Sequence, residues 1–362
     1  MDEARVIDFS SDETHLLLNP RLPADDHRGL ERLAAEAPLL RGHVWMATSG
    51  TTGALRLVAL SKKAILASAQ AVNRHLDASA HDVWLCVLPA FHVGGLGIYA
   101  RASLTGSRVV ASAWDARQFI RTITTENVTL ASLVPAQIRD LVAIGEHAPP
   151  PLRAIVVGGG ALPPSAYAAA RALGWPVLPS YGMTEACSQI ATAKGDSSEL
   201  KILSHIEVRV DAGERLAFRG QSLLTGYAFF DPAGRAAFSD PKVDGWFVSE
   251  DAGAVEGDTL RVFGRVGEFV KIGGESVDLA RLDAILDGLR HDIDAALVAV
   301  ADDRLGSVIH LATTSDESAD LVSAFNAQVL PFERIRAVRR VGTIPRSPLG
   351  KLLRSRLVAE LR

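Results

Sequence analysis

"TSGTTGALR", residues 48–56, places four hydroxyl side chains and two glycines in six positions and ends at an arginine. Glycines allow successive backbone N–H groups to point at one centre, and such a nest binds an anion to which neighbouring hydroxyls also donate. The glycine-lysine pair of a Walker loop is absent. The stretch therefore predicts a phosphate-binding loop of another kind. A plain strand-to-helix turn is the alternative, because Gly, Ser and Thr are also the usual turn and N-cap residues.

The segments around this loop alternate between strand and helix patterns. Short apolar, β-branched runs bounded by Gly or Pro predict buried strands at 43–48, 82–90, 107–113, 153–159 and 175–181. Helices are predicted at 62–76 and 163–174, the second with Pro at its start and Gly at its end. This alternation predicts an α/β domain with largely parallel strands covered by helices.

The pattern changes towards the C-terminus. From about residue 200, short strands joined by glycine-containing turns predict an antiparallel subdomain. A third region begins near residue 262 and includes a strand-like run at 294–302 and a helix-like run at 321–330. With 362 residues the chain has enough material for two domains, or for a large and a small one.

Composition excludes several classes of protein. A formal net charge of −4 gives no electrostatic reason to expect nucleic acid or anionic membrane as a partner. The acidic N-terminus and the lack of an apolar run of ~20 residues predict no secretion and no membrane insertion, and hence a cytoplasmic protein. The two cysteines, Cys86 and Cys187, lie among apolar or small residues. They predict buried reduced thiols rather than a disulfide or a thiolate metal site.

Six further motifs follow the loop in order. They are "LPAFHVGGLG" (88–97), "VVGGGALP" (156–163), "YGMTEACSQ" (181–189), "GWFVSEDAG" (245–253), "GRVGEFVKIGGE" (264–275) and "PRSPLGK" (345–351). Together with the loop, this series resembles the core motifs of the acyl- and aryl-CoA synthetase, nonribosomal adenylation and luciferase superfamily. The resemblance implies an acid-thiol ligase that works in two steps. A carboxylate attacks the α-phosphate of Mg-ATP to give an acyl-adenylate and pyrophosphate, and a thiol, usually that of coenzyme A, then displaces AMP.

The resemblance also implies the domain organisation. The fold is α/β, with a large N-terminal domain of stacked mixed sheets and helices over 1–264, a hinge over 265–267 and a small mobile α+β C-terminal domain over 268–362. Because the loop begins at residue 48, the large domain is expected to be truncated at its start. A homodimer is left open.

In such enzymes the glycine loop cradles the β- and γ-phosphates, which the resemblance assigns here to Thr48, Ser49, Gly50, Thr51, Thr52 and Gly53. Thr184 is expected to contact the α-phosphate and Glu185 to ligate Mg²⁺, a hard cation that suits a carboxylate; a surface carboxylate at a helix start is the alternative for Glu185. The rest of the ATP and AMP pocket is expected to comprise Gly158, Gly159, Gly160, Ala161, Tyr181, Gly182, Met183, Asp251 and Arg265. The family more often has Thr-Gly-Asp where this chain has Ser249, Glu250 and Asp251.

Lys351 is expected to be the adenylation lysine, because a flexible ammonium group can reach the carboxylate and the bridging phosphate oxygen together. The resemblance makes Gly267 the hinge residue and places Gly273 and Gly274 against the pantetheine tunnel. His92 matches a histidine of the tunnel and acyl pocket, with Gly95 nearby, although a lone His among apolar residues is more often a core residue.

The acid is suggested by "FHVGGLGIYAR" and "YGMTEACSQ", which look most like the o-succinylbenzoate:CoA ligases of menaquinone biosynthesis. Their substrate keeps an aromatic carboxylate after its succinyl carboxylate is activated. Arg101 is the expected partner of that group, with Ser188 and Gln189 as polar contacts; a surface charge on a helix is the alternative for Arg101. Another aryl- or acyl-CoA synthetase and an inactive nucleotide-binding protein remain open. Arg56 stands where the family commonly has lysine.

Overall fold

The computed structural model describes residues 7–48, 56–265, 269–272, 275–290, 293–302, 304–346 and 352–361. These residues form two compact units. The first comprises 1–211, 216–249 and 254–261, and the second comprises 212–215, 250–253 and 262–362. The expected domain boundary at 264 and the hinge at 265–267 stay predictions.

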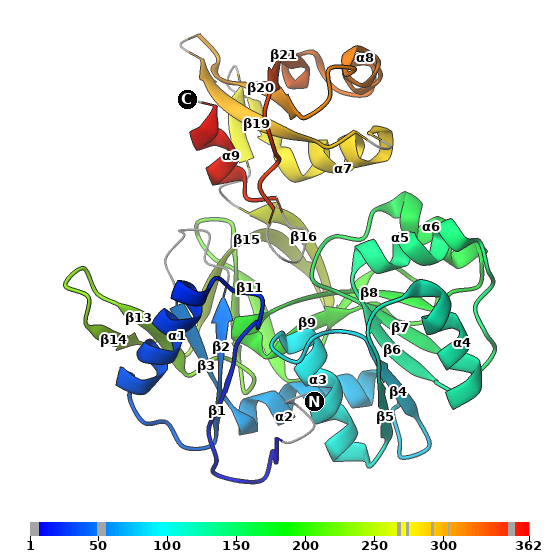
Figure 1. Ribbon diagram of the computed structural model, residues 1–362, viewed down its shortest axis with the longest axis vertical. Coiled ribbons are helices and arrows are strands. Elements are labelled where there is room, and N and C mark those ends of the chain that lie inside the picture. The colour runs from blue at the N-terminus through cyan, green and yellow to red at the C-terminus, as the bar shows by residue number, and fades with distance from the viewer. Residues whose placement is uncertain are drawn as a thin grey trace. The chain divides into compact units, whose positions relative to one another are not determined.

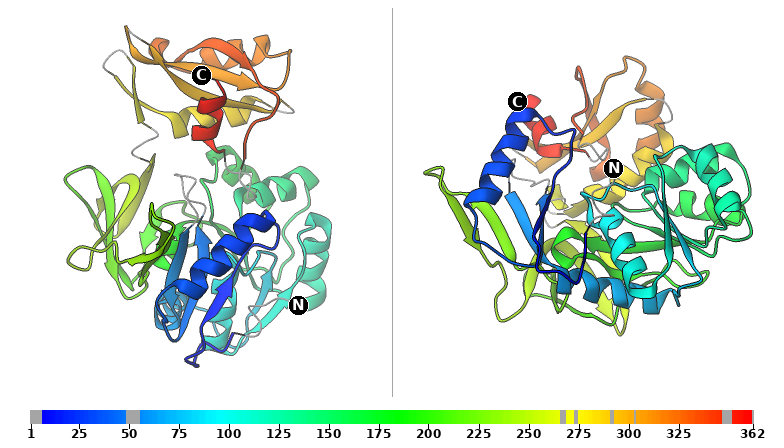
Figure 2. Two further views of the ribbon diagram at one scale, coloured as in Figure 1. Left: turned by 60° about the vertical axis from the view of Figure 1, so that its left-hand side comes forward. Right: turned by 60° about the horizontal axis from the view of Figure 1, so that its bottom comes forward.

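A five-stranded sheet carries the opening loop. Its order is β1 (His15–Leu17), β2 (His43–Thr48), β3 (Arg56–Ser61), β13 (Gly226–Phe230) and β14 (Ala236–Ser239). Helix α1 (Ala24–Glu36) lies across these strands in Figure 2 and packs Leu30 and Leu33 into a core with Trp45 and Leu57. The sheet therefore brings chain segments near residues 45 and 228 into one layer, which sequence spacing alone does not show.

The loop itself joins two antiparallel strands. Thr48 is the last residue of β2 and pairs with Arg56, the first residue of β3. The strand-to-helix alternative is wrong, because the chain runs through the buried strand β3 before α2 (Lys62–His75) begins. That helix starts where the Ser61 side chain accepts a hydrogen bond from the Ala64 N–H.

The second sheet has eleven strands, in the order β11-β12-β15-β16-β10-β9-β8-β7-β6-β4-β5. Its parallel part consists of β4 (Val83–Cys86), β5 (Arg108–Ala111), β6 (Leu130–Leu133), β7 (Ala154–Val157) and β8 (Val177–Met183). Figure 1 shows α4 (Ala116–Glu126), α5 (Pro135–Ile144) and α6 (Pro164–Ala172) grouped on one side of these strands, with α2 and α3 (Val93–Thr105) on the other. The predicted covered parallel sheet is thus confirmed.

The expected antiparallel subdomain is not a separate body. Strands β9 (Ser188–Thr192), β10 (Leu200–Ile202), β11 (Ile206–Val210), β12 (Arg215–Gly220), β15 (Phe247–Glu256) and β16 (Thr259–Arg265) extend the large sheet. The pairing β11–β12 is antiparallel, as predicted; β8–β9 and β9–β10, which begin before the predicted region, are antiparallel as well, and β13 and β14 join the five-stranded sheet instead. The turn pattern thus predicted the direction of the strands and not the sheet that each one joins.

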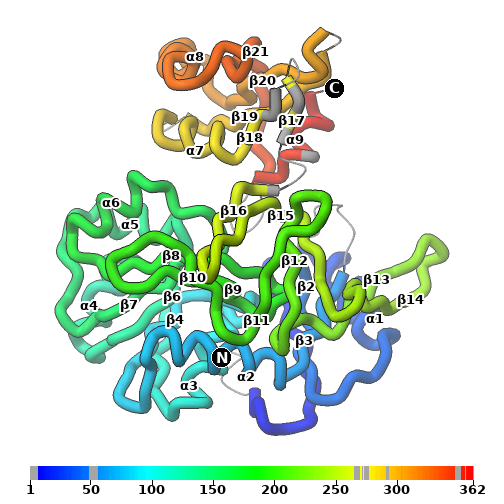
Figure 3. Tube along the Cα trace, turned by 180° about the vertical axis from the view of Figure 1, so that it is seen from behind, coloured from blue at the N-terminus to red at the C-terminus, as the bar shows by residue number. Residues whose placement is uncertain are grey.

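The second unit is α+β. Strands β19 (Ala295–Asp302), β20 (Gly306–Thr313) and β21 (Ile335–Arg340) form one sheet, and β17 (Phe269–Ile272) pairs with β18 (Glu275–Asp278). Its helices are α7 (Leu279–Leu289), α8 (Ala319–Asn326) and α9 (Arg354–Glu360), with a short 3-10 turn at Pro331–Glu333. Figure 3 shows α7 and α8 side by side, and both contribute to a core that includes Leu282, Leu297 and Phe325. The strand and helix predicted at 294–302 and 321–330 are β19 and α8.

Candidate active site

A sharp reversal after β8 places the two residues expected at the α-phosphate and the metal. The chain leaves β8 at Met183, makes a 3-10 turn over Thr184–Ala186 and returns as β9. Within this hairpin a Cβ at Gly182 would lie 1.9 Å from the Ser188 carbonyl oxygen, so only glycine fits there. Ser188 has a φ of 134°, in a region that glycine almost alone adopts.

Glu185 contacts residues from the five-stranded sheet. The Tyr227 hydroxyl donates a hydrogen bond of 2.8 Å to Glu185 Oε1, and Arg56 Nη2 lies 3.6 Å from the same oxygen. Arg56 also donates from Nε to Thr48 Oγ1 at 2.9 Å. The structure thus brings Thr48 and Glu185 to the same arginine. The Glu185 side chain is only 13% exposed, so the surface-carboxylate alternative does not describe it.

Tyr227 was not predicted as a site residue from the sequence. It sits in β13, in a run that reads only as a strand, and its contact with Glu185 spans 42 positions. Its ring also lies under the Arg56 guanidinium, whose central carbon is 4.3 Å from the ring centroid. A glycine-tyrosine pair at the start of a strand gives no local signal for such a role.

Arg101 is buried, which rules out a helix-surface charge. It is 1% exposed and lies on α3 with Nη1 3.4 Å from Ser132 Oγ and Nη2 3.4 Å from Ser188 Oγ, at the long end of hydrogen-bond distances. Its Nε atom has no partner, and no ion pair joins it to a carboxylate in the described part of the chain. Burial lowers the pKa of Arg101 to about 10, so the group is still a cation at neutral pH.

Glycines on α3 explain how the helix can carry this arginine. A Cβ at Gly95 would lie 2.2 Å from the Pro89 carbonyl oxygen, and one at Gly97 would lie 3.1 Å from Arg101 Nη2. Gly95, expected near the acyl pocket, therefore has a packing requirement of its own: it lets α3 approach the preceding loop. Gly97 leaves the space that the guanidinium occupies.

His92 begins α3 as its N-cap residue. Burial lowers its pKa from the ordinary histidine value, so the ring is neutral at pH 7. Its Nε2 atom is buried without a hydrogen-bond partner, and its ring centroid lies 4.7 Å from that of Phe91. Ring nitrogens of His15 and His205 lack a hydrogen-bond partner as well, and the role of His92 in the acyl pocket stays a prediction.

The other residues of the first unit that are expected in the pocket lie on β8 and β9 or directly after β7. Gly158, Gly159, Gly160 and Ala161 follow β7, and Gly159 has a φ of 78°, which suits glycine. The Tyr181 ring is 6.1 Å from that of Phe218, while Gln189 is buried and accepts from Thr192 Oγ1. Met183 ends β8. Their proposed contacts with nucleotide or acid stay predictions.

Comparison with known proteins supplies the family. A family model described as "AMP-binding enzyme" matches residues 14–227. The chain belongs to the AMP-binding enzymes. A 2-succinylbenzoate–CoA ligase of Bacillus licheniformis is 31% identical over 332 residues, which cover 86% of this chain and 69% of that ligase. The corresponding ligase of Enterococcus faecalis is 26% identical over 341 residues, or 88% and 69% of the two chains.

Solved structures share the fold of this AMP-binding enzyme. The o-succinylbenzoate CoA synthetase of Bacillus subtilis, in complex with its acyl-adenylate intermediate, has a TM-score of 0.80 at 23% identity and covers 94% of this chain and 78% of that one. The same synthetase with ATP and a magnesium ion has a TM-score of 0.79 at 23% identity, with coverage of 99% and 82%. The predicted α/β fold class and the resemblance to this superfamily are confirmed.

Several expected site residues of the AMP-binding enzyme fall elsewhere. Ser49, Gly50, Thr51, Thr52, Gly53, Gly267, Gly273, Gly274 and Lys351 lie outside the described residues. Asp251 lies on β15 and Arg265 ends β16, and both belong to the second unit. Ser249, at the departure from the usual Thr-Gly-Asp pattern, is buried and donates from its hydroxyl to the Leu216 carbonyl oxygen at 2.9 Å.

Glu185 is the one expected ligand of the predicted magnesium site, and this role stays a prediction. No group of three or more His, Cys, Asp or Glu side chains there could hold a metal ion. This donor set still fits Mg²⁺, because Mg²⁺ keeps several waters and commonly binds through one or two carboxylates together with substrate phosphates. The Oε2 atom of Glu185 has no hydrogen bond or ion pair to the described residues, which leaves it available as such a ligand.

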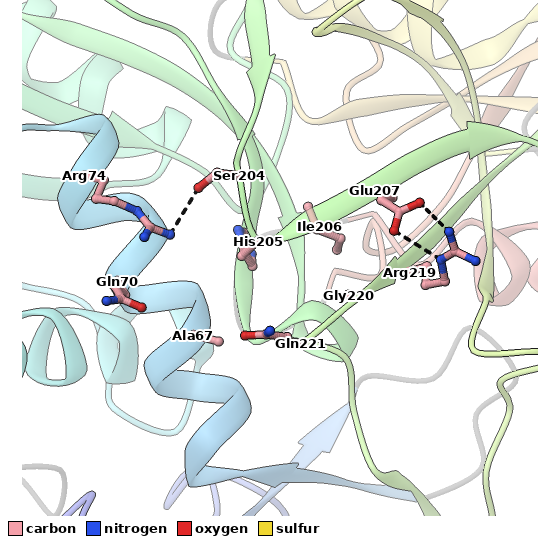
Figure 4. Close-up of a pocket in the computed structure, with 10 residues that line it drawn as sticks. All are labelled: Ala67, Gln70, Arg74, Ser204, His205, Ile206, Glu207, Arg219, Gly220 and Gln221. Carbon is pink, nitrogen blue, oxygen red and sulfur yellow. Dashed lines mark hydrogen bonds and ion pairs between the residues drawn. The ribbon is translucent and has the colours of Figure 1, made fainter.

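A separate surface cavity of about 440 Å³ contains none of the expected site residues (Figure 4). It is lined by Ala67, Gln70, Arg74, Ser204, His205, Ile206, Glu207, Arg219, Gly220 and Gln221. Arg219 pairs with Glu207, and Arg74 donates to Ser204 Oγ. Both arginines of the lining therefore already have partners within it. None of the described helices is both long and apolar enough to cross a membrane.

Proposed function

We propose that this AMP-binding enzyme is an acid-thiol ligase that activates o-succinylbenzoate with ATP and transfers the acyl group to coenzyme A in menaquinone biosynthesis. The observation that carries the proposal is Arg101, a buried guanidinium flanked by the hydroxyls of Ser132 and Ser188. A buried cation without a carboxylate partner in the described protein is costly, and a ligand carboxylate would offset that cost. The ligases to which the chain is similar are named for 2-succinylbenzoate. That acid has two carboxylates, and the reaction activates only one of them.

In the first step the residues bind and align two anions. The hydroxyls and backbone of residues 48–53 receive the β- and γ-phosphates, and Thr184 receives the α-phosphate. Glu185 holds Mg²⁺, which neutralises phosphate charge when bound. Asp251 accepts from the ribose hydroxyls, Arg265 contacts ribose or α-phosphate, and Lys351 stabilises the charge that develops as the succinyl carboxylate attacks.

In the second step the acyl-adenylate meets the thiol of coenzyme A. Rotation of the small domain about Gly267 brings Gly273 and Gly274 to the pantetheine tunnel, with His92 at its acyl end. The wide φ range of glycine makes Gly267 suitable for such a rotation. Arg101 holds the aromatic carboxylate through both steps, so that the same bound acyl group is presented first to ATP and then to the thiol.

A pair of matched acids tests the proposal. Pyrophosphate release is measured with ATP, Mg²⁺ and coenzyme A for o-succinylbenzoate and for 4-oxo-4-phenylbutanoate, which lacks only the ring carboxylate. We expect o-succinylbenzoate to have the higher kcat/KM by about 10- to 150-fold, the value of one charged hydrogen-bonded contact of ~1.5–3 kcal/mol. Equal rates, or a preference for benzoate or a fatty acid, would instead identify another aryl- or acyl-CoA synthetase.

Release of no pyrophosphate with any acid would favour a nucleotide-binding protein without ligase activity. The dispersed polar residues Glu185, Asp251, Arg265 and Lys351 argue against that alternative, because only the ligase chemistry unites them. We also propose a cytoplasmic location, as expected for an enzyme that draws on ATP and coenzyme A. A homodimer remains a prediction, which sedimentation of the purified chain would test.

A further inference from the structure

We propose that Tyr227 and Arg56 form a positioning pair that fixes Glu185 and turns its free carboxylate oxygen towards the divalent cation that accompanies ATP. The inference rests on the proposed function, since it takes Glu185 as the metal ligand. It adds that Tyr227 and Arg56 hold this carboxylate in place and that Arg56 connects it to the phosphate loop. Neither Tyr227 nor Arg56 needs to touch the metal to do so.

The two oxygens of Glu185 have different surroundings. Oε1 accepts the Tyr227 hydroxyl at 2.8 Å and lies 3.6 Å from Arg56 Nη2. Oε2 has neither kind of contact with the described residues. A carboxylate held through one oxygen cannot rotate freely, so its second oxygen keeps one direction. Such hydrogen bonds to a ligand, made behind the metal, are the usual means of orienting it.

Tyr227 is itself held rigidly. It is 8% exposed and is the second residue of β13, paired across to Val58 of β3. The next residue on the same face of β13, Phe229, pairs with Arg56. Arg56 is therefore the diagonal neighbour of Tyr227, a separation that a long side chain can cross. This register places the guanidinium over the phenol ring, at 4.3 Å from its centroid.

Arg56 makes three contacts in three directions. Its Nε donates to Thr48 Oγ1, its Nη2 faces Glu185, and its plane lies on Tyr227. A lysine ammonium has no planar fork and could not make this set at once. Because Thr48 begins the phosphate loop, Arg56 connects the base of that loop to the metal ligand. A triphosphate and its cation would then bind to Thr48 and Glu185, whose positions relative to one another are already fixed by Arg56.

The test measures how strongly metal promotes nucleotide binding. The affinity of ATP is determined by calorimetry on the full-length protein, once with saturating Mg²⁺ and once with EDTA, and the ratio of the two Kd values is the metal effect. Tyr227→Phe keeps the ring under Arg56 and removes only the hydroxyl. We expect the metal effect to fall by about 10- to 100-fold, with ATP affinity in EDTA unchanged.

Tyr167→Phe is the matched control. Tyr167 lies on α6, and its hydroxyl donates to the Asp196 carbonyl oxygen at 2.8 Å, so this variant also loses one tyrosine hydrogen bond. We expect it to keep the wild-type metal effect. Arg56→Lys retains the charge and loses the fork and the stacking, and we expect a smaller fall of about 2- to 5-fold. Thermal unfolding of each variant checks that it is folded.

Each outcome decides the proposal. A wild-type metal effect in Tyr227→Phe overturns it, and so does an equal loss of ATP affinity with and without metal, which would show a purely structural role. If Tyr227→Phe does not fold, Arg56→Lys decides alone, and a wild-type metal effect in that variant overturns the proposal. If the variants behave as expected but o-succinylbenzoate releases no pyrophosphate, the proposed acid is wrong and the positioning pair stands. A wild-type protein that binds no ATP overturns both.

Discussion

Arg56 and Arg101 are both expected to lie near bound anions, but the surroundings of their two guanidinium groups differ. Arg56 is 38% exposed on its side chain and already faces a carboxylate, that of Glu185. Arg101 is 1% exposed and, among the described residues, faces two hydroxyls and the Trp84 ring, 5.3 Å from its centroid, and no carboxylate. Arg56 has a carboxylate partner, whereas Arg101 has none among the described residues, and we propose that a ligand supplies it. A guanidinium without an internal counterion is therefore the better indicator of what a pocket was built to bind.

We expect the largest effect from removal of the Glu185 carboxylate, because it abolishes the difference between Arg56 and Arg101. In Glu185→Gln, Arg56 loses its counterion and comes to resemble Arg101, while the metal loses its protein ligand. We expect pyrophosphate release to fall by about 100- to 1000-fold, as for loss of one preorganised electrostatic contact in a transition state. Glu199→Gln, a change at an exposed carboxylate, is the control; a fall below 10-fold in Glu185→Gln would refute the assignment of Glu185.

Truncation of Arg101 should affect only acids with the ring carboxylate. For Arg101→Ala we expect kcat/KM with o-succinylbenzoate to fall by about 10- to 150-fold, because ~1.5–3 kcal/mol of charged hydrogen bonding is lost. The rate with 4-oxo-4-phenylbutanoate should change little. Arg121→Ala, on the outer face of α4, provides a variant with the same loss of charge. Equal effects on both acids would mean that Arg101 has a structural role.

A methyl group beside Arg101 tests its geometry rather than its charge. In Gly97→Ala the added Cβ would lie 3.1 Å from Arg101 Nη2, so the guanidinium must shift by a few tenths of an ångström. We expect a fall of about 3- to 10-fold in kcat/KM for o-succinylbenzoate, since sub-ångström displacement of a positioning group is costly. Gly94→Ala, where the nearest atom is Leu88 Cδ1 at 3.4 Å, should show no such fall.

The pH dependence of substrate binding should also separate the two acids. Burial sets the pKa of Arg101 at about 10, so the cation is fully present at pH 8 and is lost as the pH rises through that value. At pH 10 about half of the protein would lack the charge, and the KM for o-succinylbenzoate should be about 2-fold higher than at pH 8. The KM for 4-oxo-4-phenylbutanoate, measured in the same buffers, should not share this rise.

Local pattern predicted much of the scaffold. The strand expected at 43–48 is β2 with the same bounds, and the helix expected at 62–76 is α2, one residue shorter. Both have a clear periodicity and clear ends. Strand β3 was not predicted, because its buried run follows the loop directly and its partner β13 lies some 170 positions later in the chain.

The candidate site was predicted in part for the same reason. Motif order located Glu185 and Arg101, but the two hydroxyls beside Arg101 come from β6 and β9, and the sequence of α3 gives no sign of these partners. Tyr227 was missed because its role depends on sheet register, which places it diagonal to Arg56. Side chains that act through contacts between distant strands leave no trace in the spacing of a single segment.

The hairpin that carries Glu185 has a further consequence. Ser188 holds a backbone conformation that glycine would adopt without strain, and its hydroxyl is one of the two that face Arg101. Replacement by glycine would relieve that strain and would raise the conformational stability of the hairpin, but it would remove the hydroxyl from the pocket. The chain thus accepts a less stable fold at this position in exchange for a polar contact, and selection for heat resistance alone would act against it.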